Sequence, residues 1–285
     1  MAVYERTYKR YTGTLTPTWG RFTVIPRFAF HEVFRSRWFL VFFAVCFLPS
    51  VGAGGWIYFR NNMAKAVPIE ELQGLMPIDA DFFFALLTVQ ASLAYCLALI
   101  RGPGLVSRDL DNNGLPLFLS RPFSRVEYVA GKFSILAVLL SVVTWVPACL
   151  LIFFQASLVK GTWFQEHSDL LFEVVISSGV FVATVVLLAL AISAWVRWKP
   201  VAAFMMLMVA LGGILFGNLA AFLFNMPLLQ IFNLQQVFRS VYGLFLGVEV
   251  ENGLSAISAI FALVMWNSVS LFLLHWKLRA YEVVN

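Results

Sequence analysis

Six long apolar runs constrain the fold of this chain more than any other feature. None carries a charged residue near its middle, and they cover residues 38–59, 82–100, 133–158, 170–196, 201–224 and 254–276. A helix that crosses the roughly 30 Å hydrocarbon core of a bilayer needs about 20 apolar residues, so each run is long enough to cross. The runs are continuously apolar rather than alternating, which favours helices because backbone in lipid has to satisfy its own hydrogen bonds. The sequence therefore predicts an all-α polytopic membrane protein with six transmembrane helices.

Charged residues are few and lie mainly on one side of these runs. They make up 12% of the 285 residues, against about a quarter in soluble proteins. Cytoplasmic flanks of membrane helices accumulate lysine and arginine, and all but four of the 20 cations fall on the side that holds both termini. The exceptions are Arg60, Lys65, Lys160 and Arg239. Both termini are thus predicted to be cytoplasmic, and the net charge of +5 indicates topology in a lipid bilayer rather than nucleic-acid binding.

The segments at the two ends of the chain complete this layout. Residues 1–37 are predicted to form a cytoplasmic N-terminus that ends in an amphipathic interfacial helix, because apolar side chains from Phe30 to Trp38 recur at helical spacing beside arginines. An extension of the first span is the alternative. Residues 38–276 are predicted to form the six-span transmembrane domain, and residues 277–285 a cytoplasmic tail.

The cytoplasmic loop at 101–132 is too long for a simple helix connection, which usually takes about 2 to 8 residues. It begins with a Gly-Pro-Gly break, passes a charged stretch and then presents leucines and a phenylalanine before Pro122. This pattern predicts a short amphipathic helix parallel to the membrane. Ser124 and Glu127 form an S-x-x-E capping box, so the third membrane helix is predicted to begin there.

The outer segment at 225–253 is apolar at helical spacing but is interrupted by polar residues, among them Asn233 and Arg239. It is too polar to cross the bilayer. Irregular backbone at membrane depth is tolerated only against protein or water. We therefore expect a pair of short re-entrant helices that dip into the outer leaflet.

The layout and the loop sequence resemble a known family. An N-terminal amphipathic helix, six spans, a long cytoplasmic loop after the second span and outer helices before the sixth resemble ABC type-2 exporter permeases. The loop is similar to that of the copper-enzyme-maturation permease branch, in which acidic residues, a small-residue break, leucine-rich sequence, Ser-Arg-Pro, a basic residue and Gly-Lys follow one another. The residues in this order are Asp109, Asp111, Gly114, Leu115, Leu117, Leu119, Ser120, Arg121, Pro122, Arg125, Gly131 and Lys132.

The resemblance implies a multi-pass permease subunit, an exporter, in the inner (cytoplasmic) membrane of a bacterial cell. Such a subunit pairs with a second permease chain, identical or different, and with a cytoplasmic ABC ATPase. The chain has no G-x-x-x-x-G-K-[ST] phosphate cradle, so it is expected to be no enzyme and to hold no cofactor, with ATP and Mg²⁺ on the ATPase.

The resemblance also implies that the loop is a coupling helix in contact with the ATPase. The candidate contacts are Arg108, Asp109, Asp111, Leu117, Ser120, Arg121, Pro122 and Arg125. Simple cationic flanking of a membrane helix is the alternative reading of the arginines. Because the second and fifth spans line the dimer seam in the resembled family, Gln90 and Asn218 are candidates for the transport pathway. The largely apolar spans imply a lipidic or hydrophobic substrate, or a lateral route.

Three other function classes remain as alternatives: a polytopic membrane enzyme, an ion-coupled secondary transporter and a purely structural membrane anchor. The stretch HEVFR begins like the zinc motif H-E-x-x-H but carries Arg35 in place of the second histidine. Asp109 and Asp111 lack a third ligand nearby, so no metal site is predicted. A secondary transporter needs buried coupling charges, and the spans carry none near mid-membrane.

Overall fold

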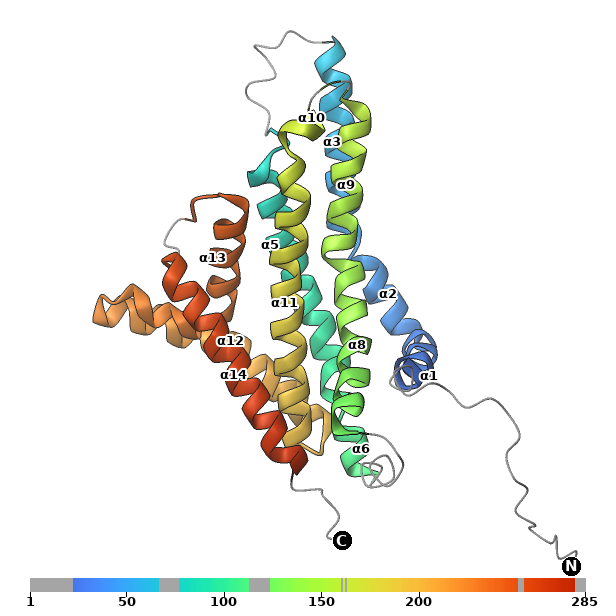
Figure 1. Ribbon diagram of the computed structural model, residues 1–285, viewed down its shortest axis with the longest axis vertical. Coiled ribbons are helices and arrows are strands. Elements are labelled where there is room, and N and C mark those ends of the chain that lie inside the picture. Colours follow the sequence, from blue (N-terminus) through green and yellow to red (C-terminus); the bar gives the residue numbers. More distant parts are fainter. Residues whose placement is uncertain are drawn as a thin grey trace, which may run out of the picture.

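The computed structural model describes residues 23–66, 77–112, 124–159, 161, 163–250 and 254–279. All regular elements in this part of the chain are helices (Figure 1). They are α1 (Val24–Phe34), α2 (Arg37–Val45), α3 (Leu48–Ala66), α5 (Ala80–Arg101), η2 (Gly102–Gly104), α6 (Ser107–Asp111), α8 (Arg125–Val143), α9 (Trp145–Leu158), α10 (Trp163–Glu166), α11 (Ser168–Trp195), α12 (Lys199–Phe224), η3 (Pro227–Phe232), α13 (Leu234–Leu246) and α14 (Ala256–Arg279).

Six of the helical stretches are long and apolar enough to cross a membrane, which confirms the predicted all-α class and the number of spans. They are Arg37–Asn62, Ala80–Asp111, Arg125–Leu158, Ser168–Trp195, Lys199–Phe224 and Ala256–Lys277. Three of them are interrupted. The stretch Ala80–Asp111 is broken by η2 between α5 and α6, and the other two breaks lie at Cys46 between α2 and α3 and at Thr144 between α8 and α9. A proline follows the breaks at Cys46 and Thr144 by three residues, Pro49 and Pro147. Proline has no N–H and clashes with the carbonyl four residues earlier, so it ends the preceding helix.

The capping box at the start of α8 forms as the sequence predicts. Ser124 Oγ accepts from the Glu127 N–H at 3.1 Å, and Glu127 Oε2 accepts from the Ser124 N–H at 2.6 Å. The helix therefore begins well before the apolar run at 133, and its first two turns are outside that run.

Helix α11 is the centre of the bundle and packs against α14, α8, α13, α5 and α9. Its buried face is rich in small residues such as Ser177, Ala189, Ala191 and Ala194. Small side chains allow neighbouring helices to approach closely. At Gly102 in η2, an added Cβ would lie only 2.8 Å from Cβ of Ala189, so this turn is pressed directly onto α11.

Helix α12 leaves the bundle sideways (Figure 1). It contacts η3 closely, because an added Cβ on Gly213 would lie 2.5 Å from the carbonyl oxygen of Phe232. Many of its large apolar side chains are exposed, among them Phe204, Leu215, Phe216, Leu219 and Phe222. An apolar face of this size on a membrane helix contacts lipid or another chain.

The segment between α12 and α14 forms two short helices, η3 and α13, as its spacing predicts. Helix α13 has one buried face and one exposed face. Val237, Phe238 and Val241 are buried, whereas Gln235 and Leu244 are exposed. It ends at Gly247, whose φ of 66° is left-handed and suits glycine.

Candidate functional site

Helices α6 and α8 meet through a charged cluster on the two sides of the loop that connects them. Lys132 Nζ lies 2.8 Å from Asp109 Oδ2, and the Tyr128 hydroxyl donates to the same oxygen at 2.6 Å. The side chains of Lys132 and Asp109 are only 13% and 19% exposed. Lys132 Nζ also lies 5.6 Å from the centre of the Tyr128 ring. Residues 109 and 132 bracket the loop, so this cluster holds its two ends together.

The turn between α5 and α6 is anchored to α11 by one buried serine. Ser193 Oγ accepts from the Val106 N–H at 2.9 Å and the Ser107 N–H at 3.0 Å, and it donates to the Pro103 carbonyl at 2.8 Å. Ser107 Oγ donates to the same carbonyl. Ser193 therefore satisfies the first N–H groups of α6, a task that a residue of the same helix usually performs.

Helix α1 is attached to the same end of the bundle (Figure 1). Arg101 Nη2 donates to the Val33 carbonyl at 2.7 Å, and its guanidinium lies 4.3 Å from the centre of the Phe39 ring. Arg108 Nη1 forms an ion pair with Glu32 Oε1 at 2.6 Å. Together with the contacts above, these bonds join α1, α2, α5, α6, α8 and α11 into one unit, which we call the anchored end.

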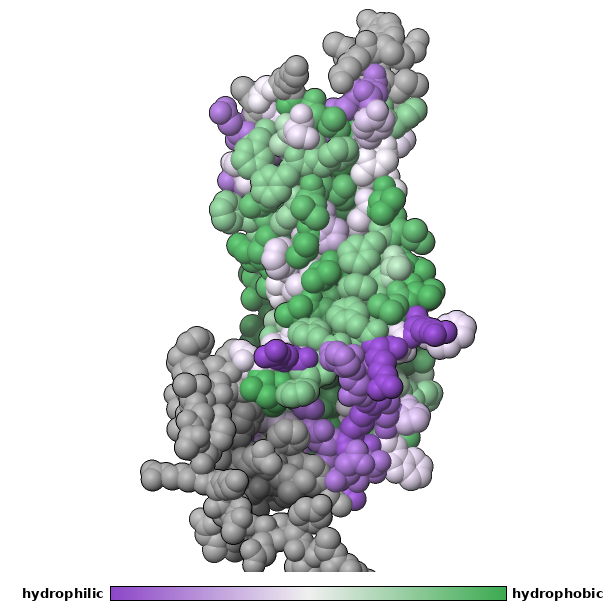
Figure 2. Space-filling model, turned by 90° about the vertical axis from the view of Figure 1, so that its right-hand side faces the viewer, coloured by the Kyte–Doolittle hydropathy of each residue, from purple (hydrophilic) through white to green (hydrophobic). Residues whose placement is uncertain are grey.

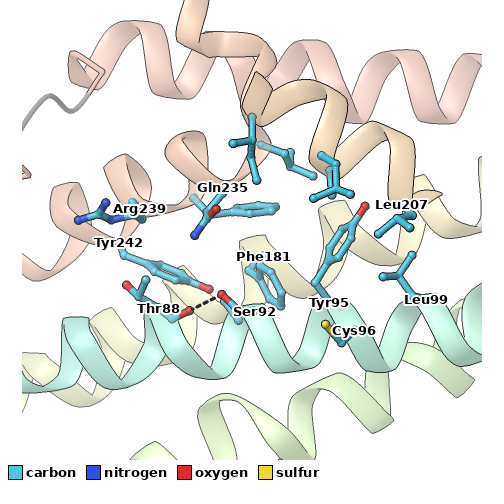
Figure 3. Close-up of a pocket in the computed structure, with 16 residues that line it drawn as sticks. Thr88, Ser92, Tyr95, Cys96, Leu99, Phe181, Leu207, Gln235, Arg239 and Tyr242 are labelled. Carbon is cyan, nitrogen blue, oxygen red and sulfur yellow. Dashed lines mark hydrogen bonds between the residues drawn. The ribbon is translucent and has the colours of Figure 1, made fainter. Parts of the chain in front are cut away.

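A cavity of about 310 Å³ lies deeper in the bundle between α5, α11, α12 and α13 (Figure 3). Most of its wall is apolar, with Phe181, Leu99 and Leu207 among the lining side chains. Thr88 and Leu99 line it from the same helix, and 11 residues of α-helix rise about 16 Å. The cavity is thus an elongated apolar space along α5.

Polar groups gather at the Thr88 end of this cavity. Figure 3 shows the Tyr242 hydroxyl directed toward Ser92, with Gln235 and Arg239 on the neighbouring turns of α13. The Tyr242 hydroxyl is buried and has no hydrogen-bond partner among the described residues. Burial raises the pKa of this phenol, so it stays protonated and can donate a hydrogen bond. The cavity therefore combines a long apolar part with one hydrogen-bonding end.

The comparison with protein families identifies the family of the chain. A family model described as ABC-2 family transporter protein matches residues 25–277, most of the chain. The chain belongs to this family. The comparison with curated proteins found no match.

The ABC-2 permease is thus the membrane component of an ABC transporter and a multi-pass membrane protein. Permeases of this family have no ATPase activity of their own, and membership implies an ATPase partner. Within the described residues, no group of three or more histidine, cysteine, aspartate or glutamate side chains could hold a metal ion.

Three of the predicted coupling residues fall on α6 of the permease. Arg108 and Asp109 take part in the anchored end, and Asp111 is exposed beside them. Arg125 is half-buried in the first turn of α8. The other predicted contacts, Leu117, Ser120, Arg121 and Pro122, lie outside the described residues.

The two predicted pathway residues differ in burial and in hydrogen-bond partner. Gln90 is fully buried, and its Nε2 donates to Ser50 Oγ. Asn218 is exposed, and its Oδ1 accepts from Asn233 Nδ2 at 3.1 Å. Neither lines the cavity of Figure 3.

Sequence reasoning missed the polar residues that do line this cavity. Thr88 and Ser92 line it from within the second membrane run, whereas Gln235, Arg239 and Tyr242 lie on α13, outside the membrane runs. Their spacing of four and three residues places them on one face of a helix, and this was the available signal. Ser193 was missed as well, because nothing local marks a serine that caps a helix distant in sequence.

Proposed function

We propose that the permease is an exporter subunit that works as a dimer in the cytoplasmic membrane of a bacterial cell, with both termini inside. A separate cytoplasmic ATPase, which binds ATP and Mg²⁺, acts on the loop after α5. The chain then transmits this movement to its membrane helices. The observation that carries the proposal is the Asp109–Lys132–Tyr128 cluster, which ties both ends of the loop to α8.

A rigid connection is the physical requirement for such coupling. Conformational changes are transmitted by packed elements that move as units. A displacement of the loop would act on α8 through Lys132, and on α11 through the bonds of Ser193. Because α11 packs against most other helices, movement at this end would reach the whole bundle.

The ATPase contacts would come from charges on and around the loop. Asp111 is exposed on α6, and Arg121 and Arg125 flank the start of α8. Arginines at such positions pair with carboxylates of the ATPase or with phosphate headgroups. Asp109 would act through Lys132 rather than by direct contact.

The cavity of Figure 3 supports a lipidic or hydrophobic substrate with a small polar group. The exposed apolar face of α12 supports pairing with a second permease chain, identical or different. The amphipathic α1 would lie at the cytoplasmic interface, and η3 and α13 would dip into the outer leaflet. The order of residues in the loop supports the copper-enzyme-maturation branch.

An association experiment tests the ATPase contact. In the double variant Arg121→Glu/Arg125→Glu, we expect the amount of ATPase that co-purifies with the permease to fall at least tenfold, because two attractive contacts become repulsive. The control is Arg197→Glu, which makes the same change on the exposed turn between α11 and α12. Equal recovery of the ATPase with the double variant and the control would remove the ion-pair role.

A labelling experiment tests the orientation. In a chain whose native cysteines are replaced, Asp111→Cys should resist a membrane-impermeant maleimide in intact cells, and Glu166→Cys should react. Reaction at position 111 in intact cells would contradict a cytoplasmic loop.

A further inference from the structure

A second cavity, of about 460 Å³, lies at the anchored end and is distinct from the one in Figure 3. It is bordered by α1, α2, α5, α6 and the start of α12. Among the described residues that line it, four are cationic and one, Glu32, is a carboxylate. The cations are Arg35, Arg101, Arg108 and Lys199. We call this space the cationic cavity.

The single carboxylate does not neutralise these cations. Glu32 is engaged by Arg108 at 2.6 Å. Lys199 has no ion-pair or hydrogen-bond partner among the described residues. The Nε of Arg101 is buried and likewise has no hydrogen-bond partner there. The cavity therefore holds donors and positive charge that the described chain leaves unsatisfied.

The cations also lie close to one another. An added Cβ on Gly104 would lie 3.5 Å from Arg108 Nε and 3.6 Å from Lys199 Cε, so these two side chains meet over the same glycine. Like charges this close repel, and the repulsion is stronger where protein and lipid exclude water. A bound anion would remove the repulsion and fill the open donors.

One wall of the cationic cavity is apolar and faces outward. Trp38 is 88% exposed and Ile100 is 39% exposed, and both line the cavity beside the buried Phe39. Figure 2 shows the side of the molecule on which α1 and α2 lie, where hydrophilic residues gather directly below an apolar band. This is the arrangement expected where lipid tails give way to headgroups.

We propose that the cationic cavity binds the phosphate of an anionic phospholipid, with Lys199, Arg101 and Arg35 around the headgroup and an acyl chain along Trp38 and Ile100. Charge favours an anionic lipid over a zwitterionic one, because each cation near a membrane surface contributes about 1 kcal/mol toward anionic lipid. The apolar wall favours a lipid over free phosphate. The lipid belongs to the cytoplasmic leaflet if the permease has the orientation proposed above.

A lipid in this position would bridge several elements of the anchored end. Arg35 follows α1, Arg101 ends α5 and Lys199 begins α12. Helix α12 already contacts η2 and α11, and the headgroup would add a connection from its first turn to α1 and α5. The bound lipid would thus stabilise the end of the permease at which coupling is proposed.

Native mass spectrometry of the purified full-length permease tests the proposal. The protein is titrated with phosphatidylglycerol, with phosphatidylcholine or with inorganic phosphate, and its thermal unfolding is measured in parallel. We expect phosphatidylglycerol to be retained and to raise the unfolding temperature, and the other two ligands to have little effect. In Lys199→Gln, phosphatidylglycerol retention should fall about fivefold, the equivalent of about 1 kcal/mol.

Two further variants make the result decisive. Arg197→Gln removes an exposed cation two residues from Lys199 that does not line the cavity, so it should retain the lipid fully. Arg35→Gln, at an exposed position, should weaken retention without a folding defect. Equal retention by Lys199→Gln and Arg197→Gln would overturn the proposal, as would equal binding of phosphatidylcholine. Stabilisation by inorganic phosphate alone would overturn the lipid assignment. None of these readouts needs the ATPase, so failure here is distinguishable from failure of the proposed coupling.

Discussion

Replacement of Lys132 by methionine removes one partner of the cluster that ties α6 to α8. Methionine keeps most of the apolar stem of lysine, so the change isolates the charge. It leaves Asp109 with one hydrogen bond, from the Tyr128 hydroxyl at 2.6 Å. It also removes the ammonium 5.6 Å from the Tyr128 ring. We expect the anchored end to loosen around the loop.

The magnitude follows from the geometry of the pair. Two unit charges 2.8 Å apart attract by about 6 kcal/mol at an effective dielectric constant near 20. Desolvation offsets much of this attraction, and loss of one partner of a fully buried pair costs about 3 to 5 kcal/mol. Lys132 and Asp109 are 13% and 19% exposed, and Asp109 keeps its bond to Tyr128. We therefore expect a loss of about 2 to 3 kcal/mol in unfolding free energy.

The assay is thermal unfolding of the permease in lipid nanodiscs, with hydrogen exchange across α6 and the start of α8. Lys132→Met should lower the unfolding temperature and speed hydrogen exchange in α6 and the start of α8. In the assembled transporter, ATPase activity should lose its coupling to transport. Asp111→Asn is the matched control, because it removes a charge at an exposed position of α6, the helix that Lys132 contacts through Asp109. It should alter stability by less than about 0.5 kcal/mol.

A double-mutant cycle completes the test. The variant Asp109→Asn/Lys132→Met should lose less stability than the sum of its single variants, with a coupling of about 1 to 2 kcal/mol. Additive losses, or a Lys132→Met effect no larger than that of Asp111→Asn, would refute the reasoning that this pair holds the two ends of the loop together.

Three further predictions concern other contacts. Ser193→Ala should destabilise the permease by about 1 to 3 kcal/mol, because it leaves two buried N–H groups without an acceptor; a loss below about 0.5 kcal/mol in denaturant unfolding would contradict the capping role. Gly213→Val should destabilise the contact of α12 with η3, where even a Cβ would lie 2.5 Å from a carbonyl oxygen, and faster hydrogen exchange in η3 should report it. Tyr242→Phe should leave stability unchanged or raise it by up to about 1 kcal/mol, since its buried hydroxyl lacks a partner in the described chain; a clear loss of stability would show that this hydroxyl is satisfied internally.

The number of membrane helices was predictable because hydropathy is a property of each segment by itself. The same holds for the start of α8, since the Ser124–Glu127 capping box acts over three residues. The interruptions at Cys46 and Thr144 were not predicted, although Pro49 and Pro147 carry a local signal for them. The coupling role of the loop residues remains a prediction. Of the predicted coupling residues, Arg108 and Asp109 form ion pairs within the anchored end.

By itself the sequence determined that the chain has six helices able to cross a bilayer, because about 20 consecutive apolar residues have no other stable arrangement in lipid. Only the tertiary structure decided that Asp109 meets Lys132, that Ser193 caps α6 from α11, and that both cavities form where they do. These contacts join residues from 23 to 87 positions apart. They depend on how helices of similar hydropathy pack, and in lipid that packing is set by side-chain shape and a few polar bonds rather than by the apolar pattern.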